Sequence, residues 1–158
     1  MTTVVIDIET VSQTLSDEQV AYLAKDCKNA DEAKDAIGKA ALYPVTGKIV
    51  CIGMLNPETN GYCMIHDLEE KVMLETFWKN VIKYSRVVTF NGRGFDIPYL
   101  LLRSAMLGVK PSRFDLMGQR FSFHPHCDLI EQLSFYGATR KCSLDMYCRS
   151  FGIQSPKT

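Results

Sequence analysis

Several features that would place this chain in a specialised class are missing from it. No apolar run approaches the roughly 18 residues of a transmembrane helix, and no basic segment precedes an apolar stretch as in a signal peptide. Net charge is also absent, because 18 Lys and Arg residues balance 18 Asp and Glu residues. This balance argues against a protein that binds nucleic acid by bulk electrostatic attraction, although it permits an enzyme with a local basic groove. We expect no membrane partner.

The six cysteines lack the spacings that mark zinc or disulfide sites. None lies in a Cys-x-x-Cys pair, which argues against a zinc finger. No secretory signal accompanies them, which argues against a disulfide framework. Cys51 and Cys63 lie in apolar, strand-like segments, where a free thiol behaves as a small hydrophobe. We therefore expect a reducing, cytoplasmic location.

The remaining composition is typical of one globular domain that spans residues 1–158. Apolar residues make up 46% of the chain and charged residues 23%. A chain of this length buries roughly two-thirds of its unfolded surface, so it needs no disulfide or metal to fold.

The hydrophobic pattern predicts an α/β fold. Period-2 apolar runs and turn signals predict strands at 3–8, 48–55, 62–65, 86–90 and 126–127. Caps and 3.6-residue periodicity predict helices at 16–28, 29–42, 68–84, 96–107, 128–136 and 143–152. Two or three antiparallel strands followed by alternating strands and helices indicate a mixed sheet covered by helices.

Three carboxylates fall where strands of this sheet end. Asp7 and Glu9 are two residues apart at the end of the first strand, so their side chains share one face. Asp96 lies at the turn from a later strand into a helix. If that strand is parallel to the first and beside it, Asp96 reaches the same edge, where α/β sheets form their sites. Carboxylate oxygens suit Mg²⁺ and Mn²⁺, and three such groups can hold two ions that cleave a phosphodiester.

Simpler explanations exist for each of these acids. Asp7 and Glu9 are equally compatible with surface acids that cap the next segment. Asp96, taken alone, is more typical of a helix N-cap. Asp128 is likewise expected to cap the helix that follows it.

The segments that carry these acids resemble a known enzyme family. Residues 5–10, Val-Ile-Asp-Ile-Glu-Thr, resemble the first motif of the DEDD 3′–5′ exonucleases. Residues 88–92 and 95–100 resemble the second motif, in the form found in family-B DNA polymerase proofreading domains. Residues 42–53 resemble the second strand of that polymerase-type group. The segments at 128–130, 143–145 and 152–153 resemble the stretch before its third motif.

This resemblance implies a fold, a reaction and roles for particular residues. The fold would be ribonuclease H-like, with strand order 3-2-1-4-5, and the reaction would remove nucleotides from single-stranded DNA or RNA 3′ ends with two Mg²⁺ or Mn²⁺ ions. Asp7 would bridge both ions, Glu9 would help to hold the ion that binds the attacking water, and Asp96 would complete the second site. Thr10 would approach the terminal nucleotide, and Asn91 and Phe95 would shape the second motif.

The third motif of the family does not appear in this sequence. A Tyr or His followed four or five residues later by a fourth Asp is expected after Gly152-Ile153, but the chain ends five residues on. We therefore expect a C-terminally incomplete domain in a shortened chain, with weak or no cleavage. The alternative is a non-catalytic nucleic-acid-binding or scaffold domain with a degenerate site.

A helical insertion, expected at about 11–46, begins beside Glu9. One hypothesis makes it a flap over the substrate strand, and the other makes it a cover over the sheet edge. The flap would contact the strand through Lys25, Lys28, Lys34 and Lys39.

Overall fold

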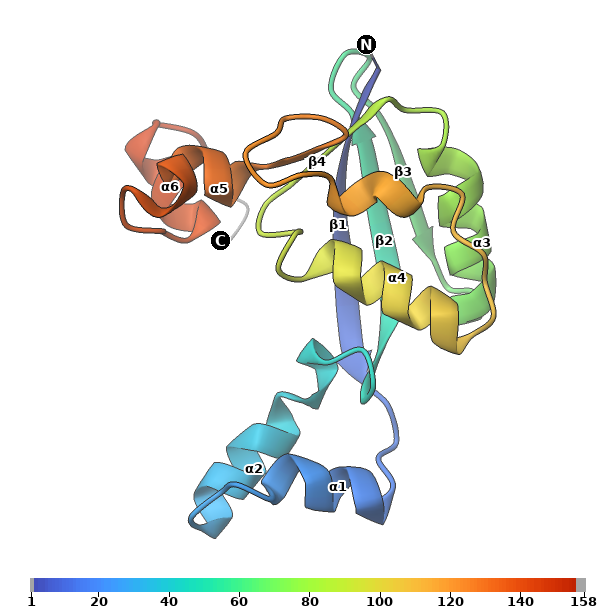
Figure 1. Cartoon of the computed structure of the whole chain (residues 1–158), viewed down its shortest axis with the longest axis vertical. Helices are drawn as coiled ribbons and strands as arrows, with labels where there is room; N and C mark the ends of the chain where they lie inside the picture. The colour runs from blue at the N-terminus through green and yellow to red at the C-terminus, as the bar shows by residue number, and fades with distance from the viewer. Residues whose placement is uncertain (1, 156–158) are drawn as a thin grey trace.

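The structure, a computed structural model, describes residues 2–155 (Figure 1). Its strands are β1 (Thr3–Ser12), β2 (Gly47–Asn56), β3 (Gly61–His66), β4 (Arg86–Thr89) and β5 (His126–Asp128). Its α-helices are α1 (Asp17–Ala24), α2 (Ala30–Gly38), α3 (Glu70–Val81), α4 (Asp96–Met106), α5 (Leu129–Leu133) and α6 (Leu144–Ser150). Three short 3₁₀ turns are η1 (Ala40–Leu42), η2 (Phe114–Met117) and η3 (Phe135–Gly137). Within residues 2–155, no helix has the length and apolar content needed to cross a bilayer.

The five strands form one mixed sheet in the order β3-β2-β1-β4-β5. The central strand β1 pairs antiparallel with β2 and parallel with β4, and β4 pairs parallel with β5. The hairpin β2–β3 turns at Asn60, which adopts a left-handed φ of 56° as the Asn-Gly signal indicated. The predicted fold class and strand order 3-2-1-4-5 are confirmed.

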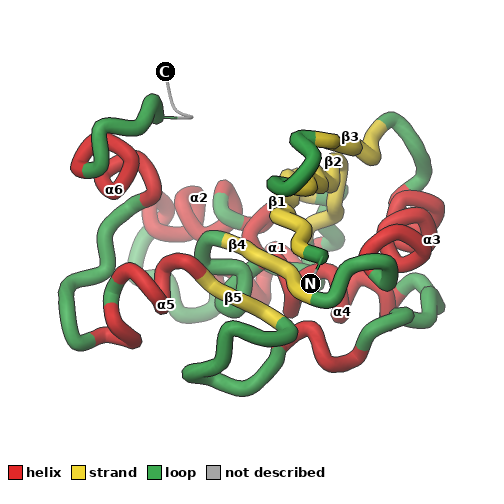
Figure 2. The backbone as a smooth tube through the Cα atoms, turned by 90° about the horizontal axis from the view of Figure 1, so that it is seen from above, coloured by secondary structure: helices red, strands yellow, loops and turns green. Residues whose placement is uncertain are grey.

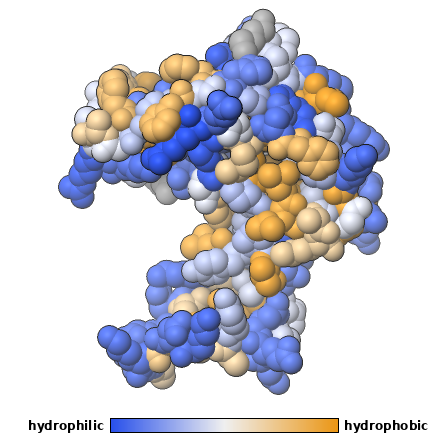
Figure 3. Space-filling model, viewed as in Figure 1, coloured by the Kyte–Doolittle hydropathy of each residue, from blue (hydrophilic) through white to orange (hydrophobic). Residues whose placement is uncertain are grey.

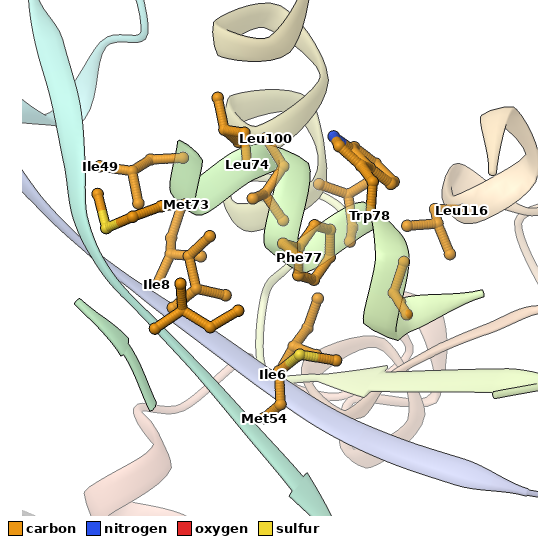
Figure 4. Close-up of a cluster of buried hydrophobic side chains, with 14 of the residues drawn as sticks. Ile6, Ile8, Ile49, Met54, Met73, Leu74, Phe77, Trp78, Leu100 and Leu116 are labelled. Carbon is orange, nitrogen blue, oxygen red and sulfur yellow. The ribbon is translucent and has the colours of Figure 1, made fainter. Parts of the chain in front are cut away.

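The core lies on one face of the sheet, under α3 and α4 (Figures 2 and 4). Alternate residues of β1 point into it, among them Ile6 and Ile8, because strand side chains alternate between faces. The predicted apolar stripe of α3 meets them there and includes Phe77 and Trp78, whose indole nitrogen donates to Ser104 of α4 at 2.8 Å.

The opposite face of the sheet is open over β1, β2 and β3 (Figure 2). Tyr62 and Met64 of β3 are 79% and 55% exposed there, although both are apolar. Asp7 lies in the same cross-strand row as Gly53 and Met64. One face of the sheet therefore holds the fold together, while the other presents the predicted acids to solvent.

The helical insertion is shorter than expected and projects beyond the sheet (Figure 1). β1 continues to Ser12 because β2 goes on pairing with it as far as Gly47, so the insertion occupies residues 13–46, called the arm below. Its helices α1 and α2 begin at the predicted caps Ser16 and Asn29. The arm extends past the ends of β1 and β2 and does not cover the sheet edge.

The prediction of a helix over 128–136 is wrong in its second half. α5 ends at Leu133, and η3 follows it. Phe135 and Tyr136 have φ values of 48° and 57°, which no α-helix accommodates. The last helix begins at the predicted cap Ser143, whose hydroxyl accepts from the amide of Met146.

Candidate active site

Asp7 and Glu9 lie side by side on the open face of β1, as period-2 geometry predicted. Both side chains are exposed, whereas Ile6, just before them, and Ile8, between them, are buried. The expectation that they end the strand is wrong, because β1 runs on to Ser12. The strand that ends here is β4, whose parallel pairing with β1 reaches only Val5. Asp7 therefore lies just past the carboxyl end of β4.

Asp96 reaches the same place from the first residue of α4. Its Oδ1 accepts a hydrogen bond from the backbone amide of Ile8 at 3.1 Å, which joins α4 directly to β1 next to Asp7. The side chain is not the helix cap, because Phe95 occupies that position without a side-chain capping bond. The structure thus brings Asp7 and Asp96 together across 89 residues of sequence.

The surroundings of Asp96 make its ionised form unfavourable. The residue is only 4% exposed. Burial raises the pKa of the Asp96 carboxyl to about 6, and the charges of Asp7 and then Asp128 add to the rise. Partial burial also raises the pKa of Asp7, against the opposing hydrogen bond from Ile8. Neighbouring carboxylates with raised pKa values need a cation beside them to be ionised at low cost.

The donor set at this edge fits a hard divalent cation. Asp7 and Asp96 offer carboxylate oxygens, the ligands that Mg²⁺ and Mn²⁺ prefer, and Glu9 shares the face of Asp7. Over residues 2–155, the side chains as they lie bring no three His, Cys, Asp or Glu groups close enough to enclose an ion. The arrangement is therefore an open pair of aspartates beside a third acid.

Asp128, expected only as a helix cap, also holds the loop at residues 90–95 between β4 and α4. It caps α5 as predicted, through the amide of Ile130 at 3.3 Å. Its two oxygens also accept from the amides of Asn91 at 2.7 Å and Arg93 at 2.9 Å. The side chain is 1% exposed. Asp128 thereby ties the loop that leads into Asp96 to the neighbouring strand β5.

Arg93 fastens the same loop through its side chain. Its Nε donates to Glu131 of α5 at 3.0 Å, and its Nη1 donates to the carbonyl of Met117. Both charged partners are about one-eighth exposed, so water screens the ion pair little. Glu131 and Arg93 are 38 residues apart in sequence, and no local motif pairs them. Sequence reasoning missed this pair.

Gly92 is required at the turn itself. A Cβ at this position would lie 2.3 Å from the hydroxyl oxygen of Thr89. That hydroxyl accepts from the Gly92 amide and bonds to Nε2 of His126, which is fully buried. Burial lowers the pKa of His126 to about 4. His126–Asp128 form β5, where the sequence predicted a short strand at 126–127.

The other predicted site residues have structural contacts of their own. Asn91 has a left-handed φ of 64° at the turn, and the Phe95 ring packs against Tyr99 with centroids 5.3 Å apart. Thr10 lies one residue beyond Glu9, and its hydroxyl donates to the carbonyl of Ala41 at 2.9 Å. Tyr99 donates to the same carbonyl at 2.9 Å. These two bonds attach the base of the arm to β1 and α4.

Cys51 of β2 lies opposite Glu9 on the open face. Burial raises the pKa of its thiol, and the charges of Glu9, Asp7 and Asp67 raise it further. The negative charge of these carboxylates therefore acts on a side chain of the neighbouring strand β2.

The domain has the fold of the family-B polymerase exonucleases. This class follows from the strand order of the sheet, the helices that cover its core face, and the two aspartates that meet at its edge. The solved structure of the family B DNA polymerase from the hyperthermophilic archaeon Pyrobaculum calidifontis matches it with a TM-score of 0.62 and 18% identity. That match covers 98% of this chain and 18% of the polymerase. DNA polymerase 1 of Sulfurisphaera ohwakuensis is 26% identical over 110 residues, which cover 58% of this chain and 13% of that protein.

A family model described as a predicted 3′–5′ exonuclease related to the exonuclease domain of PolB matches residues 44–155. The chain belongs to this family. The matched residues include Asp96 and Asp128, whereas Asp7 and Glu9 precede them. The chain spans less than a fifth of the length of the polymerases it matches.

Proposed function

We propose that this domain hydrolyses phosphodiester bonds at single-stranded nucleic-acid 3′ ends, with two divalent metal ions. The observation that supports this most directly is the meeting of Asp7 and Asp96 beside Ile8. Family membership supports the nuclease class. It favours catalysis over the alternative of a degenerate binding or scaffold domain.

Asp7, Glu9 and Asp96 would hold the ions. When bound, Mg²⁺ or Mn²⁺ would supply an activated water and stabilise the leaving oxygen. The protein would supply the position of the aspartates. Asp96 is oriented by the Ile8 amide, and its helix is placed by a loop that Asp128 and Arg93 fasten to β5 and α5.

The open face supports a polymer end as the substrate. Asp7 and Glu9 lie on the exposed side of a strand. A strand end could therefore approach them without a lid having to open. Thr10 is next to Glu9 in β1 and Phe95 precedes Asp96. By the family resemblance, Thr10 would approach the terminal nucleotide and Phe95 would shape the second motif.

The test uses a 20-nucleotide single strand carrying a fluorescent label at its 5′ end, with Mg²⁺ or Mn²⁺. Cleavage from the 3′ end produces a ladder of shortened labelled products, whereas cleavage from the 5′ end releases a labelled mononucleotide at once. From the 158-residue chain, in whose sequence the third motif does not appear, we expect at most a weak ladder. That ladder should be lost in Asp7→Ala and persist in the matched variant Asp67→Ala, which changes an exposed acid on the β3–α3 turn. Undiminished cleavage by Asp7→Ala would refute the assignment. DNA and RNA strands are tested in parallel.

A further inference from the structure

A cluster of exposed aromatic side chains lies apart from the aspartates, on the loop before β5 and on η3. Phe121 and Phe135 are 65% and 72% exposed. The rings of Phe121 and Tyr136 are in contact, with centroids 4.6 Å apart. The Arg120 guanidinium lies over the Phe121 ring at 5.3 Å. We call these four residues the aromatic platform.

The backbone of the aromatic platform adopts a conformation that bulky residues avoid. Phe121, Phe135 and Tyr136 have φ values of 71°, 48° and 57°. Positive φ is sterically unfavourable for side chains of this size. The exposed rings of Phe121 and Phe135 gain little burial in return, although the Tyr136 hydroxyl is fixed by Gln132 at 2.6 Å. Apolar groups that remain solvated in a cluster are typical of a binding surface.

The charges around the aromatic platform favour an anionic partner. Arg120, Arg140 and Lys141 are exposed, although Arg120 also lies at ion-pair distance from Glu131, at 4.0 Å. The carboxylates of the same region are engaged: Asp128 and Glu131 are buried against the 90–95 loop, and Asp145 pairs with Arg149 at 2.9 Å. The exposed surface therefore combines flat apolar rings with cationic groups.

Through Asp128, the η3 part of the aromatic platform is connected to the candidate active site. η3 follows α5, and α5 begins right after Asp128, which holds the loop that leads into Asp96. The five residues of α5 span roughly 7.5 Å at 1.5 Å per residue. η3 therefore lies one short helix away from Asp128, whose charge acts on the Asp96 carboxyl.

We propose that the aromatic platform binds single-stranded nucleic acid upstream of the 3′ end, by stacking bases on Phe121 and Phe135 and by pairing phosphates with Arg120, Arg140 and Lys141. Aromatic rings stack with any base, and basic side chains follow the backbone, which is how sequence-independent single-strand sites work. The choice of ligand rests on the proposed exonuclease function. DNA and RNA share the bases and phosphates that this surface would contact.

The test measures binding without cleavage. Fluorescence anisotropy follows the 158-residue chain with 5′-fluorescein-labelled dT20 and rU20 in EDTA. The double variant Phe121→Ala/Phe135→Ala should bind both strands roughly 5- to 100-fold more weakly, the range for loss of base stacking. The matched control is Phe114→Ala on η2, where another aromatic ring is 69% exposed. This control should leave binding within about twofold, well below the loss of one stacked base.

A second variant tests the charges. Arg140→Gln/Lys141→Gln should lower the slope of log affinity against log salt by about 1.4, because each phosphate contact on a single strand contributes roughly 0.7. The proposal is overturned if wild type binds neither strand, if Phe114→Ala loses as much affinity as the double variant, or if the double variant binds normally. Normal binding with a changed oligomeric state in light scattering would instead assign these residues to self-association.

The two proposals fail in distinguishable ways. Full cleavage by Asp7→Ala would refute the exonuclease assignment and leave the anisotropy result unchanged. Normal binding by the Phe121→Ala/Phe135→Ala variant would refute the platform and leave the aspartates as the candidate site.

Discussion

The arm and the β5–α5 junction, residues 126–133, both adjoin the candidate active site, yet they are built on opposite principles. No residue of α1 or α2 is buried, and these helices depend on local caps at Ser16 and Asn29. The junction buries Asp128 and Glu131 and bonds them to a loop more than 30 residues away. The caps on the arm therefore stabilise only its own helices. The buried charges at the junction, in contrast, position the residues around Asp96.

Charge separates the two regions as well. Between residues 13 and 46 the arm has four lysines and six carboxylates, and Lys39 is already paired with Asp35. The surface of the arm is mainly hydrophilic (Figure 3). The molecule is concave between the arm and the α5–α6 region in the same view. The basic side chains around the aromatic platform face no comparable excess of acids. We therefore expect the surface near α5 to attract phosphates more strongly than the arm does. The role of the arm as a flap remains a prediction.

The largest contrast is expected when both regions lose a helix cap. Asp128→Ala leaves two loop amides without their acceptor in a buried place, and we expect a loss of about 3–5 kcal/mol, or roughly 8–15 °C in melting temperature. Asn29→Ala removes the exposed cap of α2, whose side chain accepts from Glu32 at 2.9 Å. That loss should be about 1 kcal/mol. Thermal unfolding followed by circular dichroism measures both. Equal losses would refute the contrast.

Asp96→Asn should stabilise the protein while removing its cleavage. The folded pKa of Asp96 is about 6, above the ordinary 3.8, so the folded state binds the proton more tightly. Wild-type stability should therefore fall as pH rises from about 4 to 6 and stay lower above it, by up to about 3 kcal/mol. The variant lacks this cost, and its amide oxygen can still accept from Ile8. Melting temperatures between pH 4 and 8 in EDTA test this, and an identical pH-dependent fall in the variant would contradict it.

The smallest contrast concerns two glycines at the ends of the segment that joins α2 to β2. A Cβ at Gly47 would lie 2.7 Å from the carbonyl oxygen of Ala41, so Gly47→Ala should cost about 1–3 kcal/mol. A Cβ at Gly38, at the end of α2, meets nothing within 4 Å. Gly38→Ala should therefore stabilise by about 0.5–1 kcal/mol. Urea unfolding midpoints compare the two. A destabilising Gly38→Ala would show that α2 packs more tightly than its exposure indicates.

Local patterns predicted the elements well where one face is buried. The stripe of α3 and the alternation of β1 appear directly in the sequence, because Phe77, Trp78, Ile6 and Ile8 follow the periods of a helix and a strand. The caps at Ser16, Asn29 and Ser143 were equally readable. The motifs led to Asp7 and Asp96 as a pair, and the bond from Ile8 to Asp96 shows that the sheet brings them together.

Contacts between distant segments could not be predicted in this way. The bonds from Asp128 to the Asn91 and Arg93 amides depend on β5 lying beside β4, which no local pattern specifies. The burial of Arg103 in α4 likewise requires Glu70, 33 residues away, to pair with it at 2.6 Å. The end of α5 was missed because Phe135 and Tyr136 have no intrinsic preference for positive φ.

The position of Cys51 opposite Glu9 gives the site a built-in reporter. Burial, together with the negative field that would attract a cation, raises the pKa of the Cys51 thiol and makes it slow to react with alkylating reagents. Neutralising Asp7 and Glu9 would remove part of that field and increase the thiolate fraction. The alkylation rate of one native cysteine thus follows the charge state of the carboxylates, with no probe introduced.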